Sequence, residues 1–139
     1  EFFEQRIRMI GNHFPAFAEA LRSDTAAQLV ARPDAVDRTA ERRLKAVGDG
    51  GGYVNAAEAM RKLVGEPLTP ILSKIRCPVD VIGGEKDSFC PPKAAEMLMS
   101  GLRDAQYLEI AGAGHLVSID NPVAYAAAIK QSLDRSVRK

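Results

Sequence analysis

The chain has 139 residues, of which 46% are hydrophobic and 27% charged, a balance typical of a soluble globular domain. A net charge of +1 gives no indication of nucleic-acid binding or of a basic membrane-binding patch, and no apolar run approaches the ~20 residues of a membrane-spanning helix. Two cysteines are too few for a disulfide framework, and the first residues do not have the pattern of a signal peptide. We therefore expect a cytoplasmic protein that binds neither nucleic acid nor membrane.

Residues 1 to about 66 have the apolar spacing of helices and no strand pattern. Pro15 interrupts the first helical stretch, and the run Gly48–Gly52 separates two later ones. The apolar positions of the expected helices run from Phe3 to Phe14, from Phe17 to Leu21, from Val36 to Val47 and from Tyr53 to Val64.

After Pro67 the chain alternates between helices and strands. The expected elements are a short helix over 68–75, a strand over 79–83, a helix opened by Pro91-Pro92, a strand over 106–110 and a last helix. Asn121 and Pro122 have the residue types preferred at the N-cap and first position of that last helix.

This order predicts an α/β fold with two parallel strands joined by a right-handed crossover. A parallel sheet is normally covered on both faces and contains more than two strands. We therefore expect the N-terminal half of a larger sheet to be absent from this chain. The unpaired edge at Val79–Gly83 could instead be buried by self-association into a homo-oligomer.

Each predicted strand continues into a glycine-bearing loop with one residue able to act on a proton. The first loop contains Gly84-Glu85-Lys86-Asp87, and the second contains Gly112-Ala113-Gly114-His115. The carboxyl ends of parallel strands meet at one edge of a sheet, so we expect Asp87 and His115 to lie close together. A carboxylate and an imidazole at neighbouring strand ends are two of the three groups of a Ser-His-Asp relay.

The segment from about Leu68 to Leu133 resembles the C-terminal end of an α/β-hydrolase. The matching features are Pro78 before a Val/Ile strand, Gly84–Asp87, Pro91-Pro92 before a helix, Gly114-His115 and the Asn121-Pro122 helix start. The resemblance implies that residues 1–66 form a helical lid or cap and that residues 67–139 form the C-terminal core segment.

The same resemblance assigns Asp87 as the triad acid and His115 as the general base. The nucleophile elbow G-x-S-x-G does not occur in the sequence. The serine and the oxyanion hole are thus expected outside this chain, in the missing half of the fold, and the chain alone is expected to be inactive.

A narrower set of residues is similar to 3-oxoadipate enol-lactonases and related hydrolases of small esters and C–C bonds. The set comprises Tyr53, Ala56-Ala57, Leu72, Ile75, Pro78 and Gly114-His115-Leu116. This similarity implies a small ester, lactone or related carbonyl substrate and no cofactor. Phe89, Leu116 and Val117 flank the two loops and are the residues expected to contact that substrate.

Several structural interpretations remain open beside the catalytic one. Asp87 could be a turn residue and His115 a structural histidine. Cys77 is expected in the core, and Cys90 is expected to pack, because its sequence neighbours supply no base. The histidines and acidic residues show no metal-ligand spacing. A non-catalytic hydrolase-like binding protein, or one chain of a split hydrolase, also remains open.

Overall fold

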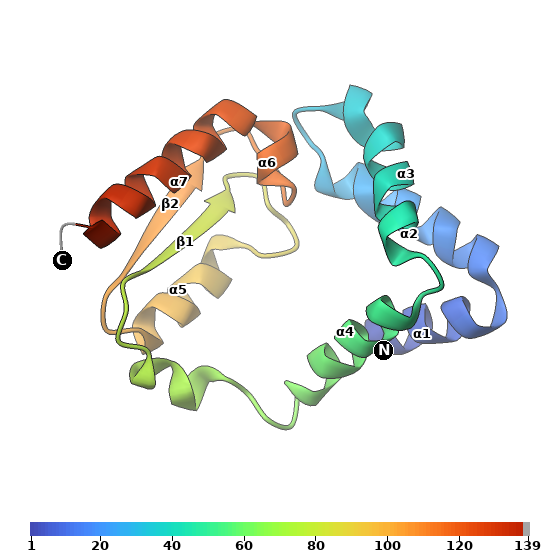
Figure 1. Ribbon diagram of the computed structural model, residues 1–139, viewed down its shortest axis with the longest axis horizontal. Coiled ribbons are helices and arrows are strands. Elements are labelled where there is room, and N and C mark those ends of the chain that lie inside the picture. Colours follow the sequence, from blue (N-terminus) through green and yellow to red (C-terminus); the bar gives the residue numbers. More distant parts are fainter. Residues whose placement is uncertain (138–139) are drawn as a thin grey trace. The chain divides into compact units, whose positions relative to one another are not determined.

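The computed structural model describes residues 1–137 and divides them into two compact units (Figure 1). The first unit contains Glu1–Ala27 and Asp34–Leu68, and the second contains Gln28–Pro33 and the described residues from Thr69 onward. Arg138 and Lys139, at the end of the predicted 67–139 segment, lie outside the described residues. The lid role of residues 1–66 and the core role of residues 67–139 stay predictions.

The first unit is helical, as predicted. Its helices are α1 (Phe2–Asn12), α2 (Phe14–Gln28), α3 (Val36–Val47) and α4 (Gly51–Lys62), and the 3-10 turn η1 (Pro33–Ala35) precedes α3. Pro15 lies in the first turn of α2, where its missing N–H costs no helical hydrogen bond. Phe17 is fully buried, and its ring packs nearly perpendicular to that of Tyr53, with 4.9 Å between the ring centroids.

The glycine run separates α3 from α4, as the sequence predicts, but α4 begins inside it. Gly48 and Gly50 have φ angles of 58° and 90°, in the left-handed region that favours glycine. Gly51 is already helical, and its N–H donates to the Asp49 carboxylate at 3.0 Å. The turn between α3 and α4 therefore uses only Gly48 and Gly50 of the glycine run, and the remaining glycines belong to α4.

The second unit has the predicted alternation of helices and strands. The short helix predicted over 68–75 is the 3-10 helix η2 (Thr69–Lys74). The elements that follow it are β1 (Val79–Gly84), α5 (Pro92–Gly101), β2 (Ala105–Ile110), α6 (Val117–Asp120) and α7 (Pro122–Val137). The strands are parallel, with Val79 opposite Ala105 and Gly84 opposite Ile110. The short helix α6 was not predicted.

Helices α5 and α7 lie along opposite faces of the strand pair (Figure 1). On the α7 side, Ile110, Ala113 and Ala128 form a buried apolar cluster, with Ile82 and Leu108 packed against it. Arg135 of α7 pairs with Asp80 at the start of β1 and with Asp104 just before β2. The register and these contacts place the ends of both strands, and the loops that follow them, side by side.

Among the described residues, no helix combines the length and the apolar character that crossing a bilayer requires.

Candidate active site

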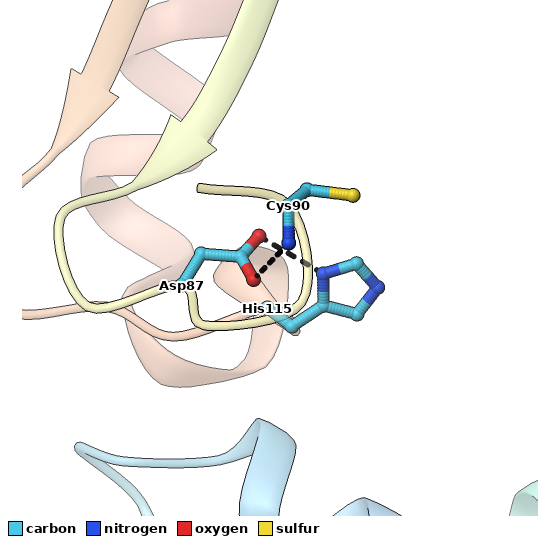
Figure 2. Close-up of side chains that lie close together, drawn as sticks. All are labelled: Asp87, Cys90 and His115. Atoms are coloured by element: carbon cyan, nitrogen blue, oxygen red, sulfur yellow. Dashed lines mark hydrogen bonds and ion pairs between the residues drawn. The ribbon is translucent and has the colours of Figure 1, made fainter. Parts of the chain in front are cut away.

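Asp87 and His115 meet across the two loops, as the sequence predicts. The Nδ1 atom of His115 lies 2.9 Å from the Oδ2 atom of Asp87. The Asp87 side chain is only 5% exposed, whereas that of His115 is 33% exposed. Figure 2 shows the far edge of the imidazole, with its second ring nitrogen, directed away from the carboxylate. The ring is thus held on one side and open on the other.

The Asp87 carboxylate is oriented by its own loop. Its Oδ1 atom accepts hydrogen bonds from the backbone N–H groups of Phe89 at 2.8 Å and Cys90 at 2.9 Å. Burial raises the pKa of Asp87, but the hydrogen bonds from Cys90, His115 and Phe89 outweigh it and bring the pKa below its usual value. The carboxylate is therefore ionised at neutral pH and favours a proton on Nδ1, which leaves Nε2 free to accept one.

Close packing of the backbone holds the two loops together. A Cβ atom on Gly84 would lie 2.3 Å from the carbonyl oxygens of both Ala113 and Gly114, so only glycine fits there. The N–H of Lys86 donates to the carbonyl of Ala113 at 2.9 Å. Glu85, expected from the sequence at the loop surface, accepts a hydrogen bond from the N–H of Gly112 at 2.8 Å.

Asp120 anchors the His115 loop to a distant part of the chain, and the sequence analysis missed it. Its carboxylate is buried and accepts backbone hydrogen bonds from Gly114, Val30, Ala31 and Arg32 at 2.7–3.1 Å. The N–H of Leu116 also donates to the carbonyl of Gln28 at 3.3 Å. An acidic residue five positions after His115 was visible in the sequence, but partners about 90 residues away were not.

A cavity of about 250 Å³ opens beside the pair, between the strands and α5. Its lining includes Val81, Gly83, Asp87, Tyr107, His115 and Val117. Of the three residues expected to contact substrate, Val117 alone is part of this lining. Phe89 is 43% exposed, with its ring tilted against the imidazole at 5.4 Å between centroids. Leu116 is half-buried.

Cys90 lies close to the imidazole of His115, a base that its neighbours in the sequence do not supply. The sulfur of Cys90, a carboxylate oxygen of Asp87 and a ring nitrogen of His115 all lie within 4.8 Å of one another (Figure 2). Burial raises the pKa of the Cys90 thiol, and the Asp87 carboxylate raises it further. Both effects oppose the thiolate, so this arrangement does not activate Cys90 as a nucleophile. Cys77, expected in the core, is exposed.

The arrangement can orient an imidazole, leave its Nε2 atom available to accept a proton, and stabilise the positive charge that follows. In a Ser-His-Asp triad, the acid and the base perform these tasks. The G-x-S-x-G motif that would carry the nucleophilic serine does not occur in the sequence.

The comparisons with solved structures point to one fold. A thermophilic esterase from Thermogutta terrifontis, solved with malate bound, matches 96% of this chain with a TM-score of 0.75 and 23% identity. A membrane phospholipase A, described as a bacterial virulence factor, matches 88% of this chain with a TM-score of 0.66 and 19% identity. The chain spans 50% of the esterase and 39% of the phospholipase. The chain thus has part of an α/β-hydrolase fold.

The sequence comparisons are less informative. No protein-family model matches the chain. The polyketide synthase ThaQ of Burkholderia thailandensis is 35% identical over 83 residues, which are 60% of this chain and 4% of the synthase. A match to so small a share of a long enzyme does not identify a family, and the likeness to the solved structures concerns the fold alone.

Proposed function

We propose that this chain is the C-terminal part of a serine-type α/β-hydrolase. In this proposal His115 is the general base, Asp87 orients it, and the nucleophilic serine belongs to a part of the fold that these 139 residues do not contain. The substrate is a small ester, lactone or related carbonyl compound, consistent with the narrower similarity to 3-oxoadipate enol-lactonases. No cofactor takes part in this chemistry.

The observation that carries the proposal is the hydrogen bond between His115 and the buried, backbone-anchored Asp87. A turn aspartate would not need a buried side chain, and a structural histidine would not need an open second nitrogen. The carboxylate holds the imidazole in one orientation, and the positive charge formed on proton transfer lies beside a negative one. The esterase and phospholipase neighbours have hydrolytic activities compatible with this chemistry.

The proposed mechanism begins when Nε2 of His115 takes the proton of the serine hydroxyl as that oxygen attacks the substrate carbonyl. The imidazolium, paired with Asp87, then returns the proton to the leaving group. Water completes the cycle by the same route, with His115 again acting as base. Residues 1–66 would act as the lid that forms part of the substrate pocket, and Phe89, Leu116 and Val117 remain proposed substrate contacts.

The test is hydrolysis of short-chain p-nitrophenyl esters and of aliphatic lactones by the longer polypeptide that supplies the serine. We expect His115→Ala to lower kcat/KM by about 10³-fold or more. The matched control is His13→Ala, since His13 is the other histidine and lies exposed between α1 and α2. A change of no more than a few-fold is expected there. Equal activity of the two variants would contradict the triad.

A split hydrolase, in which a second polypeptide carries the serine, is the second candidate. It is favoured by the two-stranded sheet, which pairs β1 with β2 alone among the described residues. Affinity purification of the tagged chain from its native host should then recover a hydrolase fragment with a G-x-S-x-G motif. Labelling of that fragment by a fluorophosphonate probe would identify the serine, whereas recovery of the chain alone would exclude this arrangement.

A further inference from the structure

The proposed hydrolytic mechanism gives no role to the Cys90 sulfur, which lies in the candidate active site. The Cys90 sulfur lies within 4.8 Å of an imidazole nitrogen of His115 and of a carboxylate oxygen of Asp87. Cys90 is an exposed free cysteine, and the mechanism requires neither its sulfur nor its thiol proton. Its backbone N–H, in contrast, is committed to the Asp87 carboxylate.

We propose that Asp87, Cys90 and His115 form a binding site for one thiophilic divalent cation, with Zn²⁺ as the best-fitting ion. A thiolate, an imidazole and a carboxylate are the three ligand types that zinc sites use. Three protein ligands leave a fourth, tetrahedral position open to water. The cation would also compensate the negative charge that Asp87 places beside the sulfur. This inference concerns a second use of the same side chains, and its inhibitory consequence rests on the proposed function.

The geometry requires only small movements. In a tetrahedral zinc site with bonds of about 2.0–2.3 Å, neighbouring ligand atoms lie roughly 3.3–3.6 Å apart. The Nδ1 atom of His115 and the Oδ2 atom of Asp87 are already 2.9 Å apart, so a cation bound by this pair would replace the proton between them. The exposed Cys90 side chain can approach by rotation about its Cα–Cβ bond. On binding, the thiol proton leaves to solvent and the imidazole proton moves from Nδ1 to Nε2, so the ligands are a thiolate and a neutral imidazole.

The loops favour such a site because their backbone is already fixed. Asp87 and Cys90 lie on one loop, joined by the hydrogen bond from the Cys90 N–H to Oδ1 of Asp87. His115 follows Gly114, whose N–H is bound by the buried Asp120. A cation held between the loops would engage the imidazole that hydrolysis needs as a base. Zinc binding should therefore inhibit the hydrolase reversibly.

The binding test uses the 139-residue chain with Co²⁺ as a spectroscopic substitute for Zn²⁺. We expect one Co²⁺ per chain, with a thiolate-to-cobalt charge-transfer band that Zn²⁺ abolishes by displacement. Cys90→Ser should lose this band and bind at least about tenfold more weakly. Cys77→Ser is the matched control, because Cys77 is the other exposed free cysteine, and it should keep the band. Absence of the band in the wild-type chain, or its loss in Cys77→Ser alone, would overturn the proposal.

A second measurement needs no substitution. Addition of Zn²⁺ should shift the imidazole NMR signals of His115 and leave those of His13 unchanged; equal shifts of both, or of neither, would contradict the site.

In the active polypeptide, Zn²⁺ should inhibit hydrolysis, a chelator should restore it, and Cys90→Ser should be at least tenfold less sensitive relative to its own metal-free rate. Binding without any hydrolase activity would refute the proposed function alone, whereas hydrolysis without zinc binding would refute the metal site alone.

Discussion

At the scale of single residues, Asp87 is the group on which the site depends. Its carboxylate is bound by two backbone N–H groups and by His115, and it is almost completely buried. A buried carboxylate without such partners would carry a raised pKa, whereas these hydrogen bonds bring the pKa of Asp87 below its usual value. The same contacts that stabilise the loop thus keep the carboxylate charged, which is what the imidazole requires.

This electrostatic arrangement predicts how stability depends on pH. Because the pKa of Asp87 is lower in the folded chain, its stabilising contribution is complete above about pH 4, the unfolded value, and is lost as the pH falls through the lower folded value. Asp87→Asn should lower the free energy of unfolding by about 1–3 kcal/mol at pH 7. The difference from wild type should shrink below about pH 4. Urea unfolding between pH 2 and pH 7 would measure this, and a difference independent of pH would contradict it.

At the scale of elements, the His115 loop is positioned by the segment 28–33, which begins at the last residue of α2 and belongs to the second unit. The carboxylate of Asp120, at the end of α6, joins three backbone N–H groups of that segment to the N–H of Gly114. A Cβ atom on Gly114 would lie 2.7 Å from the carbonyl oxygen of Gln28. Hydrogen bonds and tight packing therefore restrain Gly114, the residue just before His115.

Asp120→Asn tests this anchor. The asparagine offers one acceptor oxygen and one amide nitrogen to a site that presents only N–H donors, so at least one donor loses its partner. We expect a loss of about 1–3 kcal/mol in the free energy of unfolding and faster hydrogen exchange at residues 30–32.

Asp134→Asn is the matched control for this substitution. Asp134 forms an exposed ion pair with Lys130 at 3.3 Å, four residues earlier on α7. Such pairs contribute about 0.5 kcal/mol or less. Equal effects of the two substitutions would show that Asp120 does not hold the loop.

At the scale of the whole molecule, the second unit leaves apolar surface beside β1. A groove of about 240 Å³ on the α7 side is lined by residues that include Pro78, Ile82, Ile129 and Leu133, and the cavity of the candidate active site lies on the α5 side. Leu133 and Val137 are apolar residues four positions apart on α7, and they are 62% and 86% exposed. A parallel sheet normally has such surfaces covered on both faces.

The exposed surface predicts self-association of the isolated chain. We expect light scattering after size exclusion to give a mass above that of a monomer, rising with concentration. Leu133→Lys should shift the chain toward the monomer, because it places a charge in the groove beside β1. Val64→Lys is the control, since Val64 is 91% exposed and belongs to the first unit. A monomer at all concentrations with cooperative unfolding would contradict this prediction.

The sequence by itself determined the helices of the first unit, both strands and the loops that carry Asp87 and His115. It also determined the Asn121 cap, whose Oδ1 atom accepts a hydrogen bond from the N–H of Ala124 at 3.1 Å. These features depend on local information: the spacing of apolar residues, the position of prolines and glycines, and the rule that parallel strands end at the same edge of a sheet. Only the tertiary structure decided which side chains surround the imidazole. The anchoring role of Asp120, the nearness of Cys90 and the place of Val117 in the cavity depend on contacts between loops far apart in the sequence. Such contacts follow from close packing at strand ends such as Gly84, which no local pattern encodes.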